Sequence, residues 1–176
     1  MKSFVEHLSI YAEYHRDSRN IMTHLFGVPI IVFAVILLLS RPQFQWFGLS
    51  LSPAMILMPL VMIFYLRLNV FFALVLGALM TGAVLLSQEF AALSTLLWAA
   101  IGVGLFVLGW IVQFIGHYYE GKKPAFVDDL TGLLIGPLFV LAEVFFAVGM
   151  FKDLQQQIEQ RVGKVRGNDK RSTSVQ

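Results

Sequence analysis

The sequence predicts an all-α membrane protein, a polytopic helical bundle with an amphipathic helix at each end. Hydrophobic residues make up 57% of the 176 residues and charged residues only 14%, against about 25% charged in ordinary soluble domains. The apolar residues are gathered into long stretches, and the basic residues lie at the ends of these stretches, where membrane topology places them. A net charge of +2 gives no reason to expect a nucleic-acid partner, and the absence of cysteine excludes disulfides and thiolate metal sites.

Five apolar stretches follow the polar N-terminal region. A hydrocarbon core of roughly 30 Å takes about 20 helical residues to cross, so we expect the first four stretches to be full membrane spans. The fifth contains Gly132, Gly136, Pro137 and Glu143, and we expect a broken or re-entrant helix buried against the others. The five stretches cover residues 21–40, 47–66, 70–86, 91–115 and 130–151.

The two ends of the chain have a different pattern. Residues 3–19 mix charged and apolar side chains at helical spacing, which predicts an amphipathic helix at the membrane surface. A second such helix is expected after Phe151, where apolar residues recur at every third or fourth position. We therefore predict one integral-membrane domain over residues 1–166 and a disordered polar tail over residues 167–176.

The distribution of basic residues predicts the orientation in the membrane. The tail is rich in lysine and arginine, which favours the cytoplasmic side. Four crossings then place the N-terminus in the cytoplasm as well. The fifth stretch would enter the membrane from the cytoplasmic side and return to that side. We expect an integral protein of the cell inner membrane if the source is bacterial, or of the endoplasmic reticulum if it is eukaryotic; the sequence leaves homo-oligomerisation open. The basic residues of the tail are Lys152, Arg161, Lys164, Arg166, Lys170 and Arg171.

The chain contains four histidines, and this topology places all of them near the cytoplasmic face. They are His7, His15, His24 and His117. A single histidine in a membrane helix is usually a packing or interfacial residue, and His7 fits a surface position. Imidazoles from separate elements suit iron, zinc or copper when they converge, so the other three histidines are candidate metal ligands.

Three polar residues accompany the candidate ligands. Asn20 precedes His24 by four residues, as Gln113 precedes His117, so each imidazole has an amide on its own helical face that can orient its second nitrogen. Glu120 continues the face of Gln113 and His117. Its carboxylate is a candidate metal ligand, or alternatively an ion-pair partner of the lysines that follow it.

These residues belong to two blocks that resemble a known family, the membrane 2-hydroxy fatty acid dioxygenases first recognised in yeast phytosphingosine breakdown. The resemblance covers about residues 4–152. The first block consists of Tyr14-His15, Asn20, His24 and Val28-Pro29, and the second of Gly109-Trp110, Gln113-Phe114, Gly116-His117, Glu120, Pro124-Ala125, Asp128, Pro137 and Glu143.

The resemblance implies a non-haem iron(II) dioxygenase that uses O₂ to shorten a long-chain 2-hydroxy fatty acid by one carbon, in contact with membrane lipid. By position, it implies that His15, His24 and His117 hold Fe²⁺. Asn20 and Gln113 would support these ligands, and Glu120 would be a further catalytic residue, either beside the ligands or as an additional one.

Two other classes of function remain open from the sequence. The first is a haem protein in which His24 and His117 are the axial ligands, since two helices can hold a porphyrin in this way. The second is a membrane scaffold or transporter without enzymatic activity, in which the polar stripe serves helix association.

Overall fold

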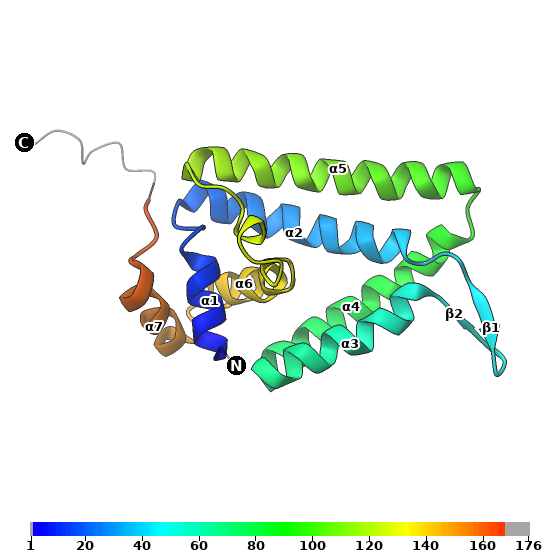
Figure 1. Cartoon of the computed structure of the whole chain (residues 1–176), viewed down its shortest axis with the longest axis horizontal. Helices are drawn as coiled ribbons and strands as arrows, with labels where there is room; N and C mark the ends of the chain where they lie inside the picture. The colour runs from blue at the N-terminus through cyan, green and yellow to red at the C-terminus, as the bar shows by residue number, and fades with distance from the viewer. Residues whose placement is uncertain (1, 168–176) are drawn as a thin grey trace, which may run out of the picture. The chain divides into compact units, whose positions relative to one another are not determined.

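A computed structural model describes residues 2–167, and in this part of the chain the secondary structure is helical apart from one short hairpin and one isolated bridge. The chain divides into two compact units. One comprises Met1–Phe26 and Ile111–Gln176, and the other Gly27–Trp110. Two long helices, α2 (Ser18–Leu38) and α5 (Thr95–Glu120), each contribute residues to both units (Figure 1).

The first unit contains the two ends of the chain. It holds α1 (Phe4–Ala12), the 3₁₀ turn η1 (Ala125–Val127), α6 (Gly132–Ala147) and α7 (Lys152–Val162). Helix α1 begins with a capping box between Ser3 and Glu6, which satisfies backbone donors of the first turn. Both α6 and α7 pack against α1. Residues 135–142 of α6 are buried throughout, so α6 supplies a large part of the core of this unit.

The second unit contains two antiparallel pairs. Strands β1 (Phe44–Trp46) and β2 (Leu49–Leu51) form a hairpin in which Phe44 lies opposite Leu51. Helices α3 (Pro53–Leu68) and α4 (Val70–Ala91) pack on one another. Asn69 is the only residue between them, and its side chain accepts a hydrogen bond from the Phe72 N–H at 3.1 Å, which caps the start of α4.

Glycines allow α2 and α5 to approach closely within each unit. In the second unit a Cβ at Gly109 would lie 3.2 Å from the Gly27 carbonyl oxygen, and a Cβ at Gly102 would meet the side chains of Leu37 and Leu38. In the first unit a Cβ at Gly116 would lie 3.2 Å from the Cα of Asn20. Close backbone contact through small residues is typical of packed membrane helices, and here it holds α5 against α2 near the histidines.

The prediction of an all-α membrane protein is confirmed, whereas the predicted four full spans and a fifth broken helix are not confirmed. Helices α2, α4 and α5 are long and apolar enough to cross a membrane, and α6 with α7 forms a pair bent by 116°, as in a broken span or a re-entrant segment. Helix α3 has only 16 residues. The predicted span over residues 47–66 is shortened because its first residues form the hairpin turn, where Gly48 has φ +77°.

The fifth apolar stretch is broken after Gly136 and Pro137 rather than at them. Helix α6 runs without interruption through Pro137. The break follows it, where Gly149 (φ +81°) and Phe151 (φ +54°) adopt left-handed conformations, and α7 then leaves at an angle. The helix predicted after Phe151 is therefore present as α7, whereas the N-terminal helix ends at Ala12, earlier than predicted.

The predicted single domain over residues 1–166 stays a prediction. The predicted disorder of the tail falls, apart from Gly167, on residues outside those that the structure describes.

We predict that Gly116→Ala lowers the thermal stability of the protein in detergent by the equivalent of about 1–3 kcal/mol, the usual cost of overpacking. The added methyl group would meet Thr23 and Asn20, and it would push α5 away from α2. Gly104→Ala is the matched control on the same helix, because a Cβ there meets nothing within 4 Å. An equal melting temperature for the two variants would contradict close packing at Gly116.

Candidate metal centre

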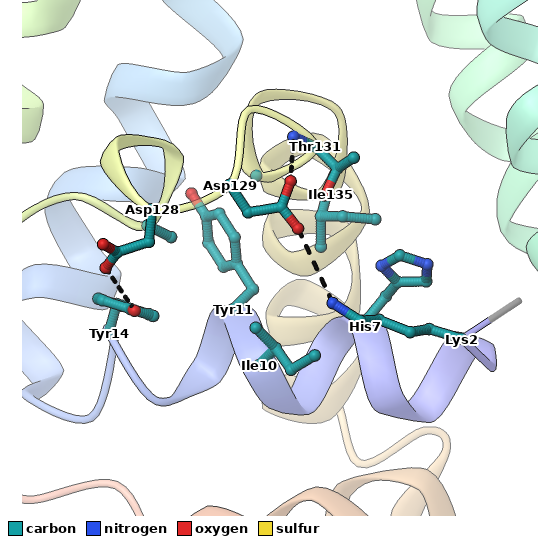
Figure 2. A pocket seen from close by; sticks show the side chains of 11 residues that line it. Lys2, His7, Ile10, Tyr11, Tyr14, Asp128, Asp129, Thr131 and Ile135 are labelled. Carbon is teal, nitrogen blue, oxygen red and sulfur yellow. Dashed lines mark hydrogen bonds and ion pairs between the residues drawn. The ribbon is translucent and has the colours of Figure 1, made fainter.

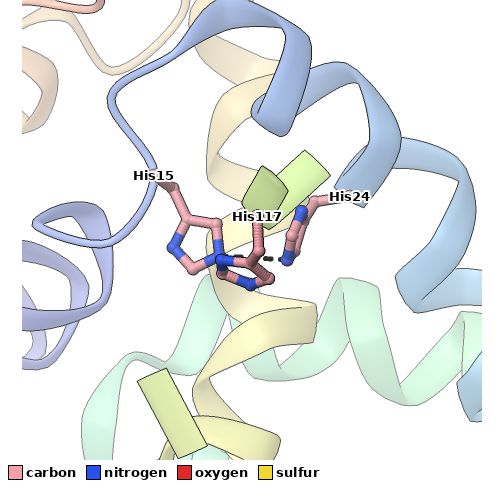
Figure 3. Close-up of side chains that lie close together, drawn as sticks. All are labelled: His15, His24 and His117. Atoms are coloured by element: carbon pink, nitrogen blue, oxygen red, sulfur yellow. Dashed lines mark hydrogen bonds between the residues drawn. The ribbon is translucent and has the colours of Figure 1, made fainter. Parts of the chain in front are cut away.

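Three of the four histidines lie together in the first unit, as predicted from their positions in the sequence (Figure 3). His15 lies in the loop between α1 and α2, His24 in α2, and His117 near the end of α5. The ring of His15 is 4.3 Å from that of His24 and 5.0 Å from that of His117, and the last two rings are also 5.0 Å apart. All three side chains are buried.

Backbone carbonyls fix the orientation of two of these rings. Nδ1 of His15 lies 2.7 Å from the carbonyl oxygen of Tyr11, and Nδ1 of His24 lies 2.9 Å from that of Asn20. A carbonyl oxygen can only accept a hydrogen bond, so each Nδ1 carries the hydrogen. In a neutral imidazole Nε2 is then unprotonated. The two bare Nε2 atoms face one another at 3.0 Å.

This geometry calls for a positive charge between the rings. Two nitrogen lone pairs at 3.0 Å repel each other unless a proton or a metal ion lies between them. Each of the three histidines offers a ligand nitrogen, and these atoms lie within 4.8 Å of one another. The Nδ1 atom of His117 is buried with no hydrogen-bond partner among the described residues. Three neutral imidazole donors with this spacing fit a divalent transition metal.

The protonation of His15 is consistent with such a site. Burial lowers the pKa of the His15 imidazole well below its ordinary value of 6.5, and the neighbouring His24 lowers it further. The ring is therefore neutral at physiological pH, and a metal ion would not have to displace a proton from it.

The same distances argue against a haem held by His24 and His117. A porphyrin lies between its two axial ligands, so their rings are on opposite faces of the macrocycle. Here the two rings are perpendicular neighbours 5.0 Å apart, and His15 lies against both of them. No slot for a macrocycle separates them.

The sequence predicted the wrong partners for the second nitrogens. The backbone carbonyl of Asn20 holds His24, while its side-chain amide donates to the Tyr14 carbonyl at 3.0 Å and to Glu120 at 3.2 Å. Gln113 is buried on α5, yet its amide does not bond Nδ1 of His117, because this atom has no hydrogen-bond partner within residues 2–167. In an α-helix the carbonyl four residues back is always close, and for His24 it took the place assigned to the amide.

The carboxylate of Glu120 binds backbone and side-chain donors around the loop that carries His15. Its Oε2 accepts hydrogen bonds from the backbone N–H groups of Arg16 at 2.9 Å and Asp17 at 2.7 Å, in addition to the Asn20 amide. Its Oε1 accepts from Arg166 at 2.6 Å. The side chain is fully buried. Because these donors occupy both oxygens, the geometry favours a positioning role for Glu120 over the predicted role of an additional ligand.

Helix α6 contributes an apolar and an ionic contact to this region. The Phe139 ring lies 5.0 Å from that of Tyr11 and 5.4 Å from that of His15, and the Tyr11 ring stacks on His15 at 4.2 Å, nearly parallel. Glu143, a carboxylate within an apolar helix, lies 3.8 Å from the guanidinium of Arg16. The site is thus closed by aromatic rings on one side of His15.

A small pocket of about 50 Å³ is lined in part by Tyr11 (Figure 2). His7 lines this pocket together with Lys2 and Asp129, which form an ion pair at 3.8 Å. Its imidazole is not among those that share the candidate metal centre. His7 therefore stays outside the ligand group, as the sequence suggested.

Sequence reasoning missed two residues of this site. Tyr11 supplies both the stacked ring and the carbonyl for His15, and its position four residues before His15 is a signal that could have identified it. Arg166 was counted only as a positive charge of the cytoplasmic tail. Nothing in its sequence context indicates that it pairs with Glu120, 46 residues earlier.

Comparison with known proteins gives two matches. A family model described as "2-hydroxy-palmitic acid dioxygenase Mpo1-like" matches residues 1–148. The chain is also 32% identical over 154 residues to 2-hydroxy-palmitic acid dioxygenase MPO1 of Saccharomyces cerevisiae, covering 86% of this chain and 85% of the yeast protein. No solved structure matches the chain.

We predict that Glu120→Ala destabilises the protein in detergent by about 2–4 kcal/mol, because it leaves the buried N–H groups of Arg16 and Asp17 without an acceptor. Thermal unfolding of the purified protein measures the loss. Glu13→Ala is the control, since Glu13 is an exposed carboxylate near the same loop and should unfold like the wild type. Equal melting temperatures would show that Glu120 does not hold the loop.

Proposed function

The chain belongs to the 2-hydroxy-palmitic acid dioxygenase Mpo1-like family, and on that premise we propose that it is an iron(II)-dependent dioxygenase of 2-hydroxy fatty acids. In this proposal His15, His24 and His117 hold Fe²⁺, and the enzyme shortens its substrate by one carbon. The name of the yeast relative gives the substrate class, a 2-hydroxy fatty acid with O₂ as co-substrate.

The observation that carries the proposal is the pair of unprotonated Nε2 atoms facing each other at 3.0 Å, with His117 beside them. When two nitrogens each lie roughly 2.1 Å from one ion and the two bonds form a right angle, the nitrogens are about 3.0 Å apart. The spacing of this pair thus fits a shared ion, and His117 offers a third nitrogen within 4.8 Å of them. Three neutral donors also leave coordination positions for other molecules.

The chemistry assigned to the metal is the activation of O₂, which iron(II) with open coordination positions supplies in non-haem oxygenases. A zinc ion in the same ligand set would have no redox chemistry. Iron is therefore the metal consistent with the family, although the three imidazoles by themselves would accept either.

The overall reaction balances with O₂ as the only oxidant. The bond between C1 and C2 breaks, C1 leaves as CO₂, and C2 is oxidised from a secondary alcohol to the new carboxylic acid. One molecule of O₂ is reduced, and one molecule of water is formed. No reductant is required.

The protein's own residues would orient the ligands and exclude water. The carbonyls of Tyr11 and Asn20 keep Nε2 of His15 and His24 directed into the site, and the Tyr11 and Phe139 rings cover His15. Glu120 holds the loop in place. These contacts fix the donor atoms before substrate arrives, which lowers the reorganisation needed during the reaction.

A membrane enzyme suits a long-chain substrate. Removing each methylene from water is worth about 0.8 kcal/mol, so a 2-hydroxy fatty acid partitions into the bilayer, where the apolar helices lie. We place the histidines and both termini at the cytoplasmic face, on the basis of the basic residues around them. The membrane would be the inner membrane in a bacterium or the endoplasmic reticulum in a eukaryote.

We predict that alanine at His15, His24 or His117 abolishes iron binding and lowers turnover of a 2-hydroxy fatty acid by at least about 100-fold. Loss of a residue that merely supports a metal ligand costs up to about that much, so loss of a ligand itself should cost at least as much. Iron content and product formation are measured on protein purified without oxygen. His7→Ala is the control, because His7 lies outside the ligand group. Wild-type iron content in all three ligand variants would refute the assignment. A wild-type protein that neither binds iron nor forms product would favour a scaffold or transporter.

We also predict that a 2-hydroxy fatty acid labelled with ¹³C at C1 releases its label as CO₂ and yields an unlabelled fatty acid one carbon shorter. The unhydroxylated acid should give no product, since it lacks the oxygen on C2 that becomes part of the new carboxyl group. Mass spectrometry of the acid and the gas phase measures both products. Retention of the label in the acid would exclude cleavage between C1 and C2.

A further inference from the structure

The residues after α7 return to the candidate metal centre. Helix α7 ends at Val162 and is followed by Gly163, where φ is +83°. Arg166 then pairs with Asp17 as an isolated parallel bridge. The Arg166 N–H donates to the Arg16 carbonyl at 2.7 Å, and the Arg166 carbonyl accepts from the Ser18 N–H at 3.1 Å. We refer to residues 163–167 as the C-terminal strap.

The strap also makes two contacts through arginine side chains. The guanidinium of Arg166 donates to Oε1 of Glu120 at 2.6 Å. The guanidinium of Arg16 donates to the carbonyl of Gly163 at 3.1 Å. Together with the bridge, these contacts join the strap both to the loop that carries His15 and to the carboxylate that holds this loop.

His15 is the ligand for which such support matters most. His24 and His117 lie within helices, whose backbone is fixed by its own hydrogen bonds. His15 lies in the loop before α2, and ordering a loop residue carries a cost in conformational entropy that other contacts must offset. The next two residues, Arg16 and Asp17, are those whose backbone groups bind Glu120 and the strap.

The ion pair between Arg166 and Glu120 is more than an exposed surface contact. Arg166 is 61% exposed, but the Glu120 side chain is 0% exposed. Removing one partner of such a pair leaves a buried charge without its counter-charge, whereas exposed pairs contribute little. The carboxylate is then less able to keep both Arg16 and Asp17 in position.

The strap lies beyond the part of the chain that the family model matches, which ends at residue 148. We propose that Arg166 is a positioning residue that acts through Glu120, and that the C-terminal strap holds the His15 loop in its metal-binding conformation. The assignment of the loop to metal binding rests on the function proposed above. The proposal that the strap holds the loop does not rest on that function, and it can be tested on metal-free protein.

Matched point variants of the full-length protein test this proposal. Arg166→Ala removes the guanidinium and leaves the backbone bridge able to form, and Arg166→Lys keeps the charge. Lys164→Ala is the control, because Lys164 is an exposed residue of the same charge two positions away. A double-mutant cycle shows whether the two residues act together. It is completed by Glu120→Gln and by the double variant that combines Glu120→Gln with Arg166→Ala.

The first measurement is amide hydrogen exchange of residues 13–18 in metal-free protein in detergent. We expect about tenfold faster exchange in Arg166→Ala, since local opening of the loop becomes easier. Lys164→Ala should exchange like the wild type, and Arg166→Lys should recover much of the protection. Equal exchange in the Arg166→Ala and Lys164→Ala variants would overturn the proposal.

The second measurement is a titration with cobalt(II), whose visible absorption reports the ligand geometry. We expect about tenfold weaker binding for Arg166→Ala, the lower end of the effect of residues that orient metal ligands. The double variant should bind no more weakly than Glu120→Gln alone, and additive losses would show that Arg166 does not act through Glu120. A wild-type protein that binds no cobalt would refute the proposed function, while hydrogen exchange would still decide the strap's role.

Two truncations test the strap as a whole. A chain ending at Gly167 keeps every contact described above, whereas one ending at Val162 loses the strap but keeps α7. We expect fast exchange of residues 13–18 only in the shorter chain. Wild-type protection of these residues in the chain ending at Val162 would overturn the proposal.

Discussion

The arrangement of the candidate metal centre depends on one buried carboxylate. Glu120 ends α5, three residues after His117, and its oxygens bind the backbone of the loop that carries His15 and the side chain of Asn20 at the start of α2. A buried carboxylate is stable only when hydrogen bonds and an opposite charge compensate for its lost hydration. The hydrogen-bond donors belong to the elements that carry the other two ligands, so these hydrogen bonds both stabilise Glu120 and bring the histidines together. The opposite charge comes from Arg166, beyond α7.

A second constraint is the direction of the imidazole nitrogens. Backbone carbonyls fix the hydrogens of His15 and His24 on Nδ1, so that two lone pairs face each other inside a buried site. Such an arrangement is unfavourable in the absence of a cation, and a polypeptide that maintains it is organised to bind one. In the function proposed above, the metal ion would offset the repulsion between these two lone pairs.

The helices and the histidine group were predictable from the sequence for different reasons. Long apolar stretches must be helical in a bilayer, because no other open structure satisfies the backbone there, and this reasoning identified α2, α4 and α5. It overestimated α3, because the hairpin at Gly48 is apolar like the helix that follows it and hydropathy does not distinguish the two. The approach of His15, His24 and His117 followed from the topology together with the family resemblance.

The sequence by itself determined the class of the protein, the helices that carry His24 and His117, and the chemistry that three imidazoles offer, since these depend on composition and on local periodicity. Only the tertiary structure decided how the ligands are held. At His24 a backbone carbonyl took the place predicted for the Asn20 amide, and Arg166 reached Glu120 across 46 residues. Hydrogen bonds between distant segments depend on where the backbone places donors and acceptors, and no local pattern of residue types encodes that placement.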